Sequence, residues 1–269
     1  MLKIFLIFLF LIFSFVSTRT QDFIIIQSTT STRDTGFYEY ILQKYSKRNS
    51  TKIKVVAVGT GQAIKNAKKC DAELLFVHHK PSELDFINKG FGTYREEIMY
   101  NDFVLVGPKN DPADLIKTKN VFEAFKKIHK TQSVFISRGD ESGTHKKEKE
   151  LWKNSGIVTS KLNNTWFIET GSGMGSSLNM AVNMDAYILT DRSTWITFQN
   201  KKNHTIILEN EPSLLNFYGI IPINPKVCPN VNFKEANAFV DWLVSIEGKD
   251  TIDSFRINGK QLFFSIRKD

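Results

Sequence analysis

The chain is expected to fold as an α/β protein in which two doubly wound lobes are joined by a two-strand hinge. Three observations predict this fold. The 269 residues exceed what one hydrophobic core usually organises. Strand and helix patterns alternate along the chain, and the alternation restarts after the Gly-Pro pair at residues 107–108. Two such lobes with two chain crossings form a clamshell, which binds ligands in the crevice beyond the strand ends.

The first residues are typical of a secretory signal peptide over residues 1–20. Lys3 precedes an apolar run at residues 4–13, and the small polar residues Ser17 and Thr18 follow. The run is shorter than the ~20 residues that span a bilayer. We therefore expect cleavage near residues 18–21 and a mature protein that is periplasmic or secreted, with a retained membrane anchor as the alternative.

The first lobe is expected over residues 21–103 and 209–269. The apolar run at residues 23–27 predicts a buried strand. Phe37, Ile41 and Tyr45, with Tyr40 beside them, are spaced for one helix face. Two more strand–helix pairs predict a parallel sheet covered by helices; they occupy residues 53–58 with 62–69, and 72–77 with 82–88.

The second lobe is expected over residues 104–208. A longer strand at residues 98–106 leads into it. Extended runs and two amphipathic helices then return the chain to the first lobe. Predicted helices are 121–128, 146–153, 176–183, 233–245 and 249–255; predicted strands are 134–137, 166–169, 186–189, 206–208 and 218–223.

The net charge of +8 does not indicate a nucleic-acid partner. The chain holds no block of five like charges, and residues 146–150 alternate in sign, as on a solvated helix face. Export would place Cys70 and Cys228 in an oxidising compartment where they could pair. The sequence leaves a disulfide and two free thiols equally open.

Gly, Ser and Thr gather at four junctions where a predicted strand meets a helix. Helix starts expose unpaired N–H groups and a partial positive charge, which favour anions. The alternative is ordinary capping, since Ser31 with Asp34 fits a capping box and Thr60 and Ser142 suit N-caps. Two junctions in each lobe favour a ligand site between the lobes; they are residues 28–32, 59–61, 137–144 and 170–173.

Arg138 is the most specific candidate for a ligand contact at these junctions. It follows a short apolar strand and precedes the helix start at residues 142–144. A guanidinium there can donate hydrogen bonds to two oxygens of a tetrahedral anion at once. The alternative is a surface arginine paired with Asp140 or Glu141, a common and weak arrangement.

Seven ordered segments resemble the substrate-binding proteins of tungstate-type ABC importers over nearly the whole mature length. Single pieces are less specific, because an Arg followed by Ser-Gly-Thr also occurs in phosphate-binding proteins. The segments are TTSTRDTG at 29–36, VVAVGTGQA at 55–63, MYNDFVLVGP at 99–108, SRGD with SGTHKKE within 137–148, ETGSGMG at 169–175, LTDR at 189–192 and GKQLFF at 259–264.

This resemblance implies a class II periplasmic-binding fold that holds tungstate or molybdate. It implies a monomer without cofactor or metal cation, whose partners are the ABC permease and ATPase subunits. One departure concerns residues 78–81, His-His-Lys-Pro, which are bulkier than expected at the crevice edge. The ligand contacts that the resemblance implies are Thr30, Ser31, Thr60, Arg138, Ser142, Thr144, Thr170 and Gly171.

The alternatives are another anion or another class of protein. Phosphate carries a proton and benefits from a carboxylate acceptor, for which Asp140 is the candidate, although Asp140 can instead orient Arg138. A secreted hydrolase is disfavoured, because the chain has no Gly-x-Ser-x-Gly elbow and no His-Glu-x-x-His. His145 is read as a residue of a helix start and not as a base. We expect no enzyme activity; a sensory module of the same fold stays open.

Overall fold

The computed structural model describes residues 23–162 and 165–267. The predicted signal peptide, its cleavage site and the membrane-anchor alternative lie outside these residues. Within the described part of the chain, no helix is both long and apolar enough to cross a bilayer.

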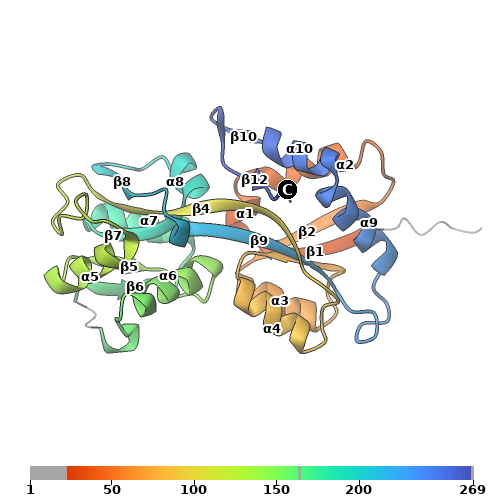
Figure 1. The fold of residues 1–269 in the computed structure, drawn as a ribbon, viewed down its shortest axis with the longest axis horizontal. Helices are drawn as coiled ribbons and strands as arrows, with labels where there is room; N and C mark the ends of the chain where they lie inside the picture. Colours follow the sequence, from red (N-terminus) through yellow and green to blue (C-terminus); the bar gives the residue numbers. More distant parts are fainter. Residues whose placement is uncertain (1–22, 163–164, 268–269) are drawn as a thin grey trace, which may run out of the picture.

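The first lobe is built on three parallel strands in the order β2-β1-β3. Alternate residues of β3 face opposite sides: Leu74 and Phe76 pack into one core cluster, Leu75 and Val77 into another. Figure 1 shows α3 and α4 on one face of the sheet, and α2 on the other together with α9 (Phe233–Val244) and α10 (Ile246–Ser254). The elements are β1 (Phe23–Thr29), α1 (Thr30–Arg33), α2 (Phe37–Tyr45), β2 (Lys52–Val58), α3 (Thr60–Lys68), β3 (Leu74–Val77) and α4 (Lys80–Asn88).

The second lobe repeats this plan around its own core. Strand β5 lies parallel to β6 and β7, and an aromatic cluster fills one side, with the Trp152 ring 4.4 Å from Phe125 and 5.1 Å from Phe135. The elements are α5 (Val121–Thr131), β5 (Phe135–Ser137), α6 (Gly143–Asn154), η1 (Thr159–Lys161), β6 (Phe167–Glu169), α7 (Met174–Asn183), β7 (Tyr187–Asp191), α8 (Arg192–Thr197) and β8 (His204–Leu208).

Two long strands, β4 (Glu96–Pro108) and β9 (Leu215–Pro222), cross between the lobes as an antiparallel pair (Figure 1). Strand β9 pairs with β3 of the first lobe, and β4 pairs with β7 and β8 of the second. The sheet is therefore continuous and mixed. The predicted α/β clamshell with a two-strand hinge is confirmed, while lobe boundaries at residues 103/104 and 208/209 remain predictions.

The C-terminal part returns to the first lobe, as predicted. Phe255 and Phe263 pack against Phe37 of α2, with ring centroids 5.4 and 4.7 Å away. A disulfide joins Cys70, just after α3, to Cys228, in the loop after β9, so the question that the sequence left open resolves to a bond. The elements are η2 (Pro212–Leu214), α9 (Phe233–Val244), α10 (Ile246–Ser254), β10 (Arg256–Ile257), β11 (Lys260–Gln261) and β12 (Phe264–Ser265).

Several helices begin earlier than the sequence predicted, and these shifts affect the site. Helix α6 begins at Gly143 and not at residue 146, and α7 begins at Met174 and not at residue 176. The capping-box interpretation of Ser31 is wrong, because Ser31 lies inside α1 and the N-cap is Thr29. Thr60 is likewise the first residue of α3 and not its cap. The hydroxyl groups of Ser31 and Thr60 therefore do not serve as helix caps.

Candidate functional site

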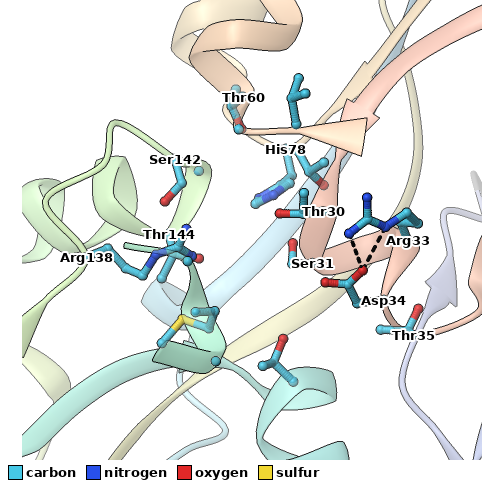
Figure 2. Close-up of a pocket in the computed structure, with 18 of the residues that line it drawn as sticks. Thr30, Ser31, Arg33, Asp34, Thr35, Thr60, His78, Arg138, Ser142 and Thr144 are labelled. Carbon is cyan, nitrogen blue, oxygen red and sulfur yellow. Dashed lines mark hydrogen bonds and ion pairs between the residues drawn. The ribbon is translucent and has the colours of Figure 1, made fainter. Parts of the chain in front are cut away.

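A cavity of about 460 Å³ lies where the two lobes face each other. Residues at the carboxyl ends of β1, β2 and β3 line one wall. The turn after β5, the starts of α6 and α7, and the middle and end of α8 line the other. Figure 2 shows Thr30 and Ser31 on one side and Arg138, Ser142 and Thr144 on the other. This is the crevice where an open α/β sheet is expected to bind a ligand.

Six of the eight predicted contacts line this cavity: Thr30, Ser31, Thr60, Arg138, Ser142 and Thr144. The first and the last of them, Thr30 and Thr144, are more than one hundred residues apart in the sequence. They meet because parallel strands present their carboxyl ends at one edge, and because the hinge turns the two edges toward each other.

The hydroxyl groups on both walls are available to a ligand. Thr60 is fully buried, and its Oγ1 has no hydrogen-bond partner in the described part of the chain. The side chains of Thr30, Ser31 and Thr144 also make no hydrogen bond with residues 23–162 or 165–267. Ser142 Oγ accepts from the His145 N–H at 3.3 Å, which leaves the serine hydrogen free to donate. A buried hydroxyl without a partner is costly, so Thr60 and Thr144 are expected to bond a ligand, while Thr30 and Ser31 are only partly buried.

Arg138 is buried, with 6 % of its surface exposed, and lines the cavity. Its Nε donates to the Ser172 carbonyl oxygen at 2.9 Å, and its Nη2 is paired with the Asp140 carboxylate. Its Nη1 bonds no group among the described residues, so it can donate to a ligand. The alternative of a surface arginine is therefore wrong, although the predicted pairing with Asp140 is present.

Asp140 acts on the turn as well as on the guanidinium. Its Oδ1 accepts from the Ser142 N–H at 3.2 Å. Asp140 does not line the cavity itself. The carboxylate is thus occupied in orienting Arg138 and holding the start of α6, which removes it as the acceptor that a protonated phosphate would use.

Glu148 supports the same turn from behind. Its Oε2 accepts from the Arg138 N–H at 3.4 Å, and the side chain is almost fully buried. Burial raises the pKa of Glu148 to about 8. The carboxyl group is therefore mostly neutral at pH 7 and adds no second negative charge beside Arg138, whose guanidinium already pairs with Asp140.

His78 is a cavity residue that the resemblance did not provide as a contact. Its Nδ1 lies 3.0 Å from Asn216 Oδ1, and the Asn216 amide donates to Asn101. Asn216 Oδ1 therefore accepts, and His78 carries its proton on Nδ1. Burial lowers the pKa of His78 to about 4, so the ring is neutral at pH 7. The adjacent His79 does not line the cavity and contacts Ser82 Oγ at 2.7 Å.

Arg33 is a second cation on the cavity wall, but it is already paired. Its guanidinium lies 2.7 Å from Asp34, and both side chains are about half exposed (Figure 2). An exposed pair of this kind contributes little and is readily screened. Arg138 is accordingly the buried cation of the cavity.

The structure does not bring Thr170 and Gly171 to the cavity. Thr170 Oγ1 donates to the Arg138 carbonyl oxygen at 3.2 Å and lies 2.8 Å from Ser177 Oγ. Gly171 is exposed, with a φ of +61°. The lining residues at this point are 173–176, because α7 begins two residues earlier than predicted.

Helix α8 contributes Thr194 and Thr197, which the sequence analysis missed. The helix has six residues, too few for a periodic signal. Asp191 is its N-cap and accepts from the Thr194 N–H at 2.9 Å. An aspartate three residues before a threonine was the available cue for this helix start.

His145 does not line the cavity. Its Nδ1 accepts from the Glu141 N–H at 3.1 Å within the start of α6. The described residues contain no group of three or more His, Cys, Asp or Glu side chains placed to hold a metal ion. The cavity thus presents donors for an anion, and His145, the base considered from the sequence, lies outside it.

A protein-family model and a relative of known function both match most of the chain. A model of the PBP superfamily domain matches residues 17–247. The tungstate-binding protein TupA of Peptoclostridium acidaminophilum is 41% identical over 240 residues, which are 88% of this chain and 83% of that protein.

Two solved structures resemble the chain in both fold and sequence. The tungstate-binding protein TupA from Desulfovibrio alaskensis G20 has a TM-score of 0.82 and 38% identity, covering 92% of this chain and 100% of its own. The tungstate ABC transporter structure from Geobacter sulfurreducens has a TM-score of 0.78 and 41% identity, covering 87% and 98%.

Proposed function

Because the chain belongs to the PBP superfamily and, within it, to the tungstate-binding substrate-binding proteins of ABC importers, we propose that it captures tungstate outside the cytoplasm. It then delivers the anion to the permease and ATPase subunits of an importer. In this role the protein binds and releases its ligand unchanged, works as a monomer and needs no cofactor.

The observation that supports this proposal best is the set of donors that face one cavity from both lobes. Among the residues that the structure describes, no group bonds Arg138 Nη1, and the Thr60 hydroxyl is buried without a partner. A dianion that leaves water regains its lost hydration only if its oxygens find donors. Hydrogen bonds to a charged group contribute about 1.5–3 kcal/mol each, so six or seven are enough for tight capture.

The proposed ligand contacts are the six predicted residues that line the cavity. They provide one guanidinium, from Arg138, and five hydroxyl groups. One guanidinium does not neutralise a dianion. The N-termini of α3 and α6 share the remaining negative charge, since the first N–H groups of each helix lack intrahelical acceptors. Thr170 acts indirectly, by holding the turn at Arg138.

Tungstate fits these donors better than phosphate does. Tungstate is fully deprotonated at neutral pH and accepts hydrogen bonds without donating any, whereas phosphate needs an acceptor for its proton. Asp140 points to Arg138 and Ser142, and Asp34 is paired with Arg33. Molybdate has the charge and shape of tungstate and is the alternative ligand; phosphate is less suited.

Isothermal titration calorimetry with the mature chain tests this function. We expect tungstate and molybdate to bind much more tightly than sulfate or phosphate. The cavity offers donors for oxygens, and the carboxylate that lines it, Asp34, is paired with Arg33. Equal affinity for phosphate would contradict the assignment, and a chain that binds none of the four anions would overturn it. Hydrolysis of phosphate esters by the same preparation would favour the hydrolase alternative.

A further inference from the structure

The two walls of the cavity touch where α6 begins. A Cβ added at Gly143 would lie 2.3 Å from His78 Cε1 and 2.9 Å from each ring nitrogen. Atoms at such distances overlap, since carbon atoms pack best at about 3.5–4.0 Å. Gly143 belongs to the second lobe and His78 follows β3 of the first. A glycine at this point lets the two lobes approach so closely.

The His78 ring is held firmly in place. Nδ1 is bonded to Asn216 Oδ1 at 3.0 Å, and the ring lies 4.8 Å from that of Tyr218, centroid to centroid. Asn216 and Tyr218 both belong to β9, one of the two hinge strands. The side chain is 8 % exposed. Because the ring is hydrogen-bonded to Asn216 and packed against Tyr218, it behaves as a rigid part of the hinge end of the cavity.

Two other contacts join the lobes on this side. The Lys146 Nζ of α6 donates to Ser82 Oγ of α4 at 3.0 Å. Gly61, in the first turn of α3, faces the Glu141 carbonyl oxygen, which would lie 3.6 Å from an added Cβ. That separation is an ordinary contact, so Gly61 has room for a methyl group where Gly143 has none.

We propose that the contact between His78 and Gly143 sets how closely the two walls of the cavity approach, and thereby positions the donors of both lobes around the anion. His78 is a positioning residue in this account, acting through Gly143. The proposal rests on the proposed function, because it concerns the capture of a tetrahedral oxyanion between the walls.

The geometry predicts what a single methyl group does. Gly143→Ala moves the walls apart by roughly 1.2–1.7 Å, the difference between the overlapping and the ordinary contact distance. Ser142 and Thr144 lie next to Gly143, so their distances to the Thr30 and Thr60 side of the ligand increase together. Hydrogen bonds weaken steeply over such a change.

The test is a cycle of four chains titrated with sodium tungstate by calorimetry: wild type, Gly143→Ala, His78→Ala and the double variant. We expect Gly143→Ala to raise Kd at least about tenfold in the wild-type background. In the His78→Ala background the same substitution should raise Kd less than about twofold, since the ring is gone. The His78→Ala chain is its own reference, whatever its affinity.

Gly61→Ala is the matched control. It is the same substitution, at the start of another helix between the lobes, and Gly61 does not line the cavity. Its Kd should stay within about twofold of wild type. Circular dichroism and thermal unfolding of the ligand-free variants check the fold.

The outcomes distinguish the proposed His78–Gly143 contact from the proposed capture of tungstate. An equal loss in both His78 backgrounds, or no loss from Gly143→Ala, overturns the proposed contact while tungstate capture stands. A Gly143→Ala chain that does not fold also contradicts the contact, because the overlap lies between the lobes and not inside one. If the wild type binds another anion of the panel, the cycle is repeated with that anion. If it binds none, both proposals fail.

Discussion

Replacing Arg138 with alanine should cost about 3–5 kcal/mol of tungstate binding free energy, or roughly two to three and a half orders of magnitude in Kd. The guanidinium is buried, and its Nε and Nη2 are already bonded to the protein. These bonds hold Nη1 toward the ligand before it arrives. The substitution also leaves the Asp140 carboxylate unpaired near an incoming dianion, which adds repulsion.

Two other variants calibrate this loss, measured by the same titration. Thr60→Val keeps the shape of the side chain and removes one buried hydroxyl, so it should cost about 1.5–3 kcal/mol. Arg33→Ala should cost less than about 1 kcal/mol, because Arg33 is half exposed and paired with Asp34. A loss from Arg33→Ala as large as that from Arg138→Ala would show that net charge, and not the buried guanidinium of Arg138, drives binding.

Removing the disulfide should give the largest change in stability. Cys70 and Cys228 close a loop with a sequence separation of 158. Loop-closure entropy predicts a stabilisation of about 5 kcal/mol for a loop of this length, and native disulfides usually contribute about 2–5 kcal/mol. The double variant Cys70→Ser with Cys228→Ser should therefore unfold at a clearly lower denaturant concentration.

Tungstate affinity should change little in the double serine variant, because neither cysteine lines the cavity. Cys70 is exposed, so a reductant added to the wild type should reproduce the destabilisation. An unfolding midpoint that neither reduction nor the double substitution alters would contradict a bond between the two sulfurs in the folded protein.

The order of strands and helices was readable from the sequence because each element carries its own local pattern. The α2 residues Phe37, Ile41 and Tyr45 follow helical spacing, and all three are buried in the first core. The continuous apolar run of β1 is typical of a strand covered on both faces. Such patterns depend on neighbours within a few residues.

The site was partly predictable for a related reason. Gly, Ser and Thr at strand ends mark helix starts, and parallel strands bring such starts to one edge. The exact start of α7 decided whether residues 170–171 or 173–176 reach the cavity, and boundaries shift by a residue or two. The short helix α8 gave no periodic signal, so Thr194 and Thr197 were missed.

Features that depend on distant parts of the chain were not predictable. The pairing of Cys70 with Cys228 requires the loop after β9 to meet the end of α3, which neither segment encodes alone. The contact of His78 with Gly143 arises because the hinge brings β3 and α6 together. The bulk of residue 78 was visible in the sequence, but its partner was not.

The most direct test of the central claim is a crystal structure of the mature chain with tungstate, with the metal located by its anomalous scattering. We predict one strong peak between the lobes, with oxygens in hydrogen-bond range of Arg138 Nη1, Thr60 Oγ1 and the Ser142 hydroxyl. A peak elsewhere on the molecule, or one contacted by a single lobe, would contradict capture by converging donors.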